Sequence, residues 1–129
     1  MASWQAGIVV VASAGNTGPE PMSIGVPGNL PYVITVGAMT DNYTPDDPSD
    51  DAIANFSSSG PSVEGFVKPE MVAPGGHILG SMSWSERLAQ AHEAFFDSGL
   101  SYFTMSGTSS KGRCDGISAV IISAPYAAI

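Results

Sequence analysis

The chain has 129 residues, a formal net charge of −8, 12% charged residues and 43% hydrophobic residues. This length predicts a single domain, and the hydrophobic content excludes an intrinsically disordered chain. Because phosphate binding needs a basic surface, the acidic balance argues against nucleic acid and anionic membranes as partners. No run approaches the ~18 consecutive apolar residues of a membrane span. Residues 1–6 lack the basic start of a signal peptide, so we expect none.

Two segments near the start of the chain predict strands that are covered on both faces. Ile8–Ser13 and Tyr32–Ala38 are nearly continuous apolar runs, rich in β-branched residues and without apolar–polar alternation. Such runs are typical of parallel sheets. The segment between them carries four prolines and is predicted to be a loop. These features predict an α/β fold with a mainly parallel sheet.

Shorter elements follow in the rest of the chain. Short strands are predicted at Ile53–Ser57, Met71–Ala73, His77–Met82 and Tyr102–Met105. Between the last two strands the pattern changes, because serines able to cap a helix precede apolar residues at helical spacing. We therefore predict a helical insertion at about residues 83–97.

Two small-residue turns follow predicted strands and carry the residues with the most obvious chemistry. Gly107-Thr108-Ser109 comes after Tyr102–Met105, and Gly15-Asn16 comes after Ile8–Ser13. A serine hydroxyl on a tight turn at a strand end suits a nucleophile. A fixed asparagine amide suits the stabilisation of an oxyanion. The sequence therefore predicts acyl transfer, with Ser109 as nucleophile and Asn16 as oxyanion donor.

Five segments, in the same order along the chain, resemble those of the subtilisin-like serine proteases (subtilases, peptidase family S8). They are the oxyanion segment Ala12–Pro19, Tyr32–Ala38, Phe56–Pro61, the Lys-Pro-Glu-Met-Val-Ala-Pro-Gly block at Lys68–Gly75, and the nucleophile motif Met105–Ser109. The resemblance covers roughly residues 4–109. It corresponds to the C-terminal half of a family catalytic domain.

This resemblance implies a partial subtilisin-like fold with a mainly parallel twisted sheet over residues 1–109. It also implies hydrolysis of peptide or small ester bonds, no required cofactor and a secreted parent protein. Two departures stand out: no segment matches the family's triad Asp and His motifs, and the sequence after Ser109 leaves the family pattern. We therefore expect residues 110–129 to be an atypical tail, from a shifted reading frame or a fusion, with Cys114 as a bystander thiol.

A serine nucleophile needs a general base, and the chain offers His77 and His92. By resemblance neither histidine stands at the family's catalytic position. The candidate carboxylates that could orient such a histidine are Asp97 and Asp115. Three interpretations stay open. The chain is a truncated serine hydrolase whose base is one of these histidines, comes from a second polypeptide or is absent; a metal-assisted hydrolase; or a catalytically inactive, self-associating remnant.

The segment 41–51 contains five aspartates and two prolines, which predicts an exposed loop. A second interpretation is a calcium site formed by Asp46, Asp47 and Asp50, since clustered carboxylates suit a hard cation.

Two further expectations follow from the family analogy. The segment Ser58, Ser59 and Gly60 would border the substrate-binding pocket. A half domain would leave a sheet edge and an apolar face uncovered, so we expect a homo-oligomer.

Overall fold

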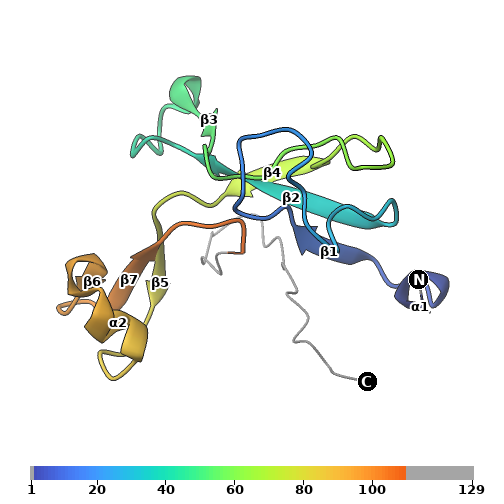
Figure 1. Cartoon of the computed structure of the whole chain (residues 1–129). Coiled ribbons are helices and arrows are strands. Elements are labelled where there is room, and N and C mark those ends of the chain that lie inside the picture. The colour runs from blue at the N-terminus through green and yellow to red at the C-terminus, as the bar shows by residue number, and fades with distance from the viewer. Residues whose placement is uncertain (1, 110–129) are drawn as a thin grey trace.

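The structure, a computed structural model, describes residues 2–109, and its strands form two small sheets (Figure 1). The elements are α1 (Ala2–Gln5), β1 (Val10–Ser13), β2 (Val33–Thr40), η1 (Pro48–Asp50), β3 (Ala52–Ile53), β4 (Met71–Pro74), β5 (Ile78–Ser81), α2 (Arg87–Ala91), η2 (Glu93–Phe95), β6 (Phe96–Asp97) and β7 (Tyr102–Met105). The first sheet contains β1 to β4, and the second has the order β5-β7-β6. In Figure 1 the second sheet and α2 extend from the first sheet as an arm.

Strand β2 is the centre of the first sheet because partners occupy both of its edges. It pairs in parallel with β1 and with β4, and antiparallel with β3 at its end. From Thr35 to Ala38 every residue of β2 is buried. The buried hydroxyl of Thr35 is satisfied, because it donates to the carbonyl oxygen of Gly28 at 2.6 Å. Cover on both faces explains why the sequence of this strand does not alternate.

The predicted strands at Ile8–Ser13, Tyr32–Ala38, Met71–Ala73, His77–Met82 and Tyr102–Met105 are confirmed within one or two residues of their bounds. The prediction of a mainly parallel sheet is not confirmed. The β2–β3 pair and both pairs of the second sheet are antiparallel, so the described part of the chain is mixed. The strand predicted at Ile53–Ser57 is limited to Ala52–Ile53, because Ser57 turns its hydroxyl to the N–H of Ala38 at 3.0 Å.

The predicted helical insertion is shorter than the pattern suggested. The α-helix spans Arg87–Ala91, continues as one 3₁₀ turn and ends where Phe96 begins β6. Ala89 is the buried residue of this helix, and Phe103 of β7 is 4% exposed nearby in the same arm. The apolar residues at 95 and 96 therefore serve a turn and a strand instead of a longer helix.

Lys68 and Glu70 complete the edge of β2 ahead of β4. The Glu70 carboxylate accepts from the N–H of Thr35 at 2.8 Å, and the Lys68 ammonium donates to the carbonyl oxygen of Val33 at 2.7 Å. The two side chains also form an ion pair of 2.5 Å, in which Lys68 is 1% exposed and Glu70 41%. A buried ammonium needs such partners, so this pair explains the Lys-Pro-Glu sequence.

The surroundings of Glu70 make the stability of the fold depend on pH. Desolvation would raise the pKa of its carboxyl, but the hydrogen bonds from Lys68 and Thr35 outweigh it and hold that pKa below its ordinary value of 4.5. A carboxyl with a depressed folded pKa contributes stability that is present above its unfolded pKa. That contribution is lost as the pH falls through the lower, folded value.

We expect Glu70→Gln to lower the free energy of unfolding near pH 7 by about 1–2 kcal/mol. The loss stays below the 3–5 kcal/mol of a fully buried pair, because solvent screens a half-exposed carboxylate. Chemical denaturation at pH 7 and pH 3 measures it, with the exposed Glu64→Gln as control. The difference from the wild type should shrink as the pH falls below 4.5 towards the lower folded pKa of Glu70, so it should be smaller at pH 3 than at pH 7. An equal loss at both pH values would contradict this account.

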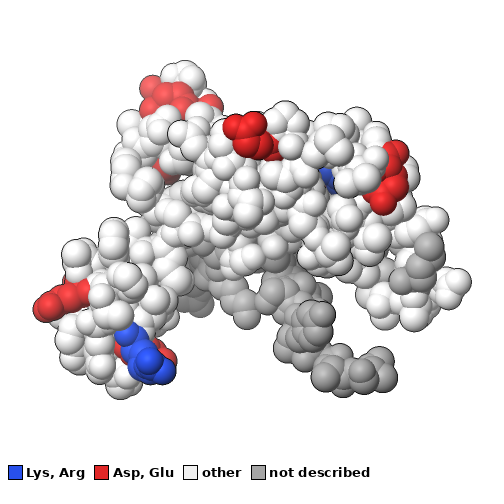
Figure 2. Space-filling model, viewed as in Figure 1, with Lys and Arg blue, Asp and Glu red and all other residues white. Residues whose placement is uncertain are grey.

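The face of the molecule shown in Figure 2 carries few charges, with one basic patch on the arm. On the face shown in Figure 2, acidic side chains gather at the periphery, including the loop beside β3, and most of the surface is uncharged. Among residues 2–109, none of the helices has the length and apolar character needed to cross a membrane.

Candidate active site

The loop that carries Asn16 leaves β1 through a backbone path that needs glycine. Gly15 has a φ of +108°, and a Cβ there would lie 2.9 Å from the Oγ of Ser58. At Gly18 a Cβ would lie 1.9 Å from the carbonyl oxygen of Ser57, so alanine cannot fit unless the backbone moves. The N–H of Ser58 donates to the carbonyl oxygen of Gly15 at 2.9 Å. The Asn16 loop is therefore fixed against residues 57–58.

The side-chain amide of Asn16 is held in one orientation by Thr108, which lies 92 residues away in the sequence. The N–H and the hydroxyl of Thr108 donate to Oδ1 of Asn16 at 2.9 and 3.0 Å. The same hydroxyl accepts from the N–H of Gly15 at 3.2 Å, and Thr108 is 4% exposed. Because a backbone N–H can only donate, the atom facing it must be the oxygen, which leaves the Nδ2 donor for another acceptor.

Thr108 has no predicted role. Its one signal was its position inside Gly107-Thr108-Ser109, directly before the candidate nucleophile.

Ser109 follows β7 through a short turn that is anchored to the first sheet. The N–H of Gly107 donates to the carbonyl oxygen of Gly75 at 2.8 Å, at the point where the chain leaves β4. Ser109 is exposed, and its hydroxyl donates to the Oγ of Ser13 at the end of β1 at 3.1 Å. The two predicted residues, Asn16 and Ser109, therefore both lie beside Thr108.

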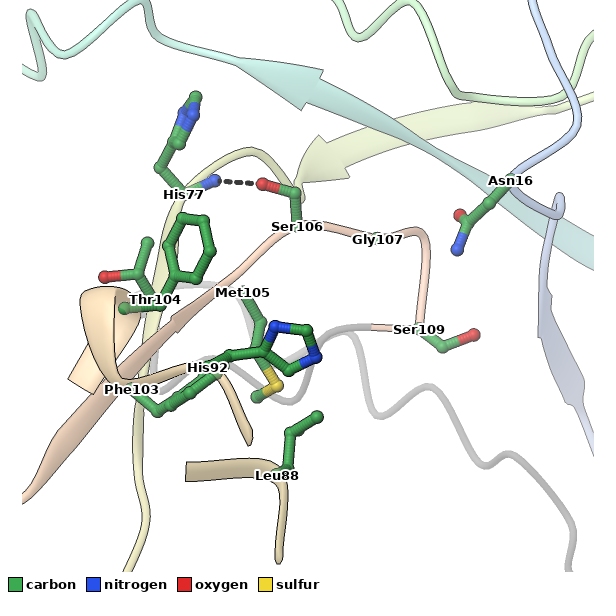
Figure 3. A pocket seen from close by; sticks show the side chains of 11 residues that line it. Asn16, His77, Leu88, His92, Phe103, Thr104, Met105, Ser106, Gly107 and Ser109 are labelled. Carbon is green, nitrogen blue, oxygen red and sulfur yellow. Dashed lines mark hydrogen bonds between the residues drawn. The ribbon is translucent and has the colours of Figure 1, made fainter. Parts of the chain in front are cut away.

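Both residues line one open cleft of about 680 Å³ between the two sheets. Its lining consists of Asn16, His77, Leu88, His92, Phe95, Phe103, Thr104, Met105, Ser106, Gly107 and Ser109. In Figure 3 the amide nitrogen of Asn16 points to the side on which Ser109 lies. A carbonyl group that enters this end of the cleft can meet a hydroxyl nucleophile and an amide donor together.

The two histidines also line the cleft, but they differ in orientation. The ring of His77 packs against Tyr43, with centroids 4.3 Å apart, and its backbone N–H donates to the Oγ of Ser106 at 2.9 Å. In Figure 3 this ring is turned away from Ser109, whereas the imidazole of His92 projects into the cleft on the side of Ser109. Among residues 2–109, no hydrogen bond joins Ser109 to an imidazole, and the hydroxyl of Ser109 donates to Ser13 instead.

Among residues 2–109, neither histidine forms a hydrogen bond or ion pair with the candidate orienting carboxylate Asp97. Oδ1 of Asp97 accepts from the N–H groups of Gly99 and Leu100 at 2.9 and 3.3 Å, which shapes the turn after β6. Asp115, like Cys114 and the rest of 110–129, lies outside the described residues.

The segment Ser58, Ser59 and Gly60, predicted to border the substrate, packs against the Asn16 loop and is not among the residues that line the cleft. Ser58 is 1% exposed and bonds to the Asn16 loop. The hydroxyl of Ser59 donates to the carbonyl oxygens of Pro19 and Glu20 at 2.9 and 3.0 Å. A Cβ at Gly60 would lie 2.6 Å from the carbonyl oxygen of Lys68. In this structure the segment braces the loop that holds Asn16.

The acidic loop makes internal hydrogen bonds. The hydroxyl of Thr44 donates to both carboxylate oxygens of Asp50, at 2.8 and 2.7 Å. Asp47 caps η1, and the hydrogen bonds from the side chain and N–H of Ser49 hold its pKa below the ordinary value.

Within residues 2–109, no group of three His, Cys, Asp or Glu side chains could hold a metal ion. The geometry of the described residues therefore lends no support to calcium at Asp46, Asp47 and Asp50, or to a metal-assisted hydrolase.

Comparison with known proteins gives relatives of one kind. The model of the Subtilase family matches residues 1–110. Serine protease AprX of Bacillus subtilis (strain 168) is 44% identical over 124 residues, which cover 93% of this chain and 27% of AprX. Pyrolysin of Pyrococcus furiosus is 34% identical over 100 residues, covering 59% of this chain and 7% of pyrolysin. The chain thus spans about a quarter of AprX and a smaller share of pyrolysin, and the AprX match extends past residue 110.

Solved structures agree with the sequence comparison. The S41 psychrophilic protease has a TM-score of 0.56 and 26% identity, over 82% of this chain and 30% of that protein. Sphericase has a TM-score of 0.55 and 25% identity over the same shares. The mixed sheets described here are therefore part of a subtilisin-like fold, and the chain belongs to the subtilase family.

Proposed function

We propose that this chain carries the nucleophile and the oxyanion donor of a serine hydrolase that acts on peptide or small ester bonds. The observation behind this proposal is the amide of Asn16, oriented by Thr108 at 2.9 and 3.0 Å beside the exposed hydroxyl of Ser109. Its relative AprX is named a serine protease, which supports peptides as the substrate class.

The proposed reaction follows from these two groups. The Oγ of Ser109 attacks the carbonyl carbon of the substrate, and the negative charge that develops on the carbonyl oxygen receives a hydrogen bond from Nδ2 of Asn16. The proton of Ser109 passes to a base, and the leaving amine or alcohol takes up a proton as the acyl-enzyme forms. Water then releases the acyl group.

For the base we propose His92 in preference to His77. Its imidazole faces the end of the cleft that contains Ser109 (Figure 3), whereas the ring of His77 is packed against Tyr43. A base from a second polypeptide remains the alternative source. A chain without any base would keep slow hydrolysis of activated esters, because the oxyanion donor acts independently of the base.

The experiment that tests this function is treatment of the chain with a serine-directed fluorophosphonate, followed by peptide mass mapping. An adduct on Ser109 supports the hydrolase. An intact protein without adduct supports the alternative, an inactive and self-associating member of the family.

One observation favours self-association as a property of this chain. Strand β1 pairs only with β2 among the described residues, and Ile8 and Val9 just before it are 56% and 62% exposed. An uncovered strand edge beside exposed apolar side chains invites pairing with another chain.

We expect the chain to be a dimer or larger in light scattering at high concentration. Val9→Asp should shift it towards the monomer, because a charge cannot enter an apolar interface without cost. The control is Val63→Asp, since Val63 is 77% exposed on a different loop. A monomeric wild type at all concentrations would reject the oligomer.

A further inference from the structure

The wall of the cleft that belongs to the arm is largely apolar, with His92 and Thr104 as its polar members. Leu88 of α2 and Phe95 of η2 are 45% and 56% exposed, and both line the cleft. Phe103 of β7 lies beneath them at 4% exposed, and its ring centroid is 6.4 Å from that of Phe95. Among the described residues that line the cleft, none is Asp, Glu, Lys or Arg. Leu88, Phe95 and Phe103 therefore form an apolar wall in which two large side chains are exposed to solvent.

Exposed apolar side chains in a concave site indicate a ligand that covers them. Scattered exposed apolar residues are ordinary on a surface, but here two of them converge on a cleft that also contains a nucleophile. Transfer of apolar surface out of water is favourable by about 25 cal/mol per Å². A charged ligand group in the same place would lose hydration without a partner. The chemistry of the wall therefore selects an uncharged apolar group.

The apolar wall and the candidate nucleophile are within reach of one short peptide. Strand β7 carries Phe103 and leads through the Ser106–Gly107 turn to Ser109. Six residues of extended chain span at most about 20 Å. A peptide of that length bound along the cleft can hold its carbonyl group at Ser109 and a side chain on the wall.

We propose that Leu88, Phe95 and Phe103 form a recognition pocket for one large apolar side chain of the peptide substrate, such as phenylalanine or leucine. The pocket belongs to the segment between β5 and β7, so it adds selectivity to the site without touching the reacting atoms. This inference rests on the proposed function, because it names the peptide class that the same site accepts.

The test uses the 129-residue chain and the peptides acetyl-Gly-Gly-X-Gly-Gly-amide, with X as Phe, Ser or Asp. Each peptide has a single side chain, at X. Whichever way the peptide lies along the cleft, X is therefore the side chain that can enter the pocket. Titration followed by NMR of the backbone amides gives the affinity and the place of binding. The Phe peptide should bind about tenfold tighter than the Ser or Asp peptide, because burial of roughly 50 Å² of apolar surface is worth that factor. The chemical-shift changes that the Phe peptide causes in the backbone amides should centre on Leu88, Phe95 and Phe103.

Variants separate the pocket from general binding. Leu88→Ser and Phe95→Ser should each weaken the Phe peptide by about three- to tenfold. Leu100→Ser should leave it unchanged, since Leu100 is 67% exposed on the same arm and is not part of the cleft lining. Circular dichroism confirms that each variant is folded. Equal affinities for the three peptides, shifts centred elsewhere, or a Phe affinity that ignores both variants would overturn the pocket.

The same measurements separate this inference from the proposed function. A fluorophosphonate adduct on Ser109 together with equal peptide affinities overturns the pocket and keeps the hydrolase. Discrimination between the peptides without any adduct supports the pocket and removes the hydrolase.

Discussion

Replacement of Ser109 by alanine is expected to abolish both fluorophosphonate labelling and the hydrolysis of short-chain nitrophenyl esters. The hydroxyl is the proposed attacking atom, and it is exposed at the end of the cleft, next to the amide of Asn16. Alanine removes that atom and leaves the hydrogen bonds of Thr108 in place. The variant should therefore fold as the wild type does and show only the background rate of ester hydrolysis.

The control for this variant is a serine outside the cleft. Ser85 is exposed, and its hydroxyl bonds to that of Ser83 at 2.8 Å, so Ser85→Ala should keep the adduct and the esterase rate. Unchanged hydrolysis by the Ser109 variant would reject this residue as nucleophile. It would then turn attention to Ser106, the other serine that lines the cleft.

The central strands could be predicted from the sequence because their burial leaves a local signal. Both Val10–Ser13 and Val33–Thr40 are parts of apolar runs that need cover on two faces. Strand direction leaves no such signal. The antiparallel pairing of β5 with β7 joins residues as far apart in the sequence as Ile78 and Met105, and apolar content alone does not encode it.

The arm shows how tertiary packing overrides a helical pattern. Leu88, Ala91 and Phe95 recur near helical spacing, yet α2 ends at Ala91. Phe96 instead pairs with Phe103 as a short strand, and its ring packs against Trp84 with centroids 5.2 Å apart. The gain from these contacts exceeds the small helix propensity of one more turn.

The reactive residues of the candidate site could be predicted from the sequence, but the residues that hold them in place could not. The turns at Asn16 and Ser109 stand out because small residues follow apolar strands, and the family motifs reinforce them. What holds Asn16 is a threonine 92 residues away, and a sequence gives no direct measure of that proximity. Ser58, Ser59 and Gly60 are predicted to border the substrate by analogy alone, and the sequence carries no sign of their hydrogen bonds to the segment around Asn16.

Replacement of Asn16 by alanine is expected to slow acylation of Ser109 by about 100- to 1,000-fold. This range is the one known for removal of the corresponding type of donor in subtilisin, a member of the same family. The rate of fluorophosphonate labelling measures it directly, because the phosphonyl oxygen needs the same donor as a carbonyl oxygen. Binding of an acetylated peptide amide should change little, since the donor acts on charge that develops during the reaction.

The Thr108→Val variant tests whether orientation of the amide matters in addition to its presence. Valine keeps the backbone N–H that donates to Oδ1 but removes the hydroxyl that bonds to Oδ1 and Gly15. With one of two restraints lost, we expect a smaller reduction of about tenfold, again in the labelling rate and not in peptide affinity. Asn55→Ala, on an exposed loop, should have no effect. If fluorophosphonate labels Asn16→Ala at a rate within twofold of the wild type, the amide of Asn16 does not stabilise the oxyanion. The comparison of Asn16→Ala with Thr108→Val would then say nothing about catalysis.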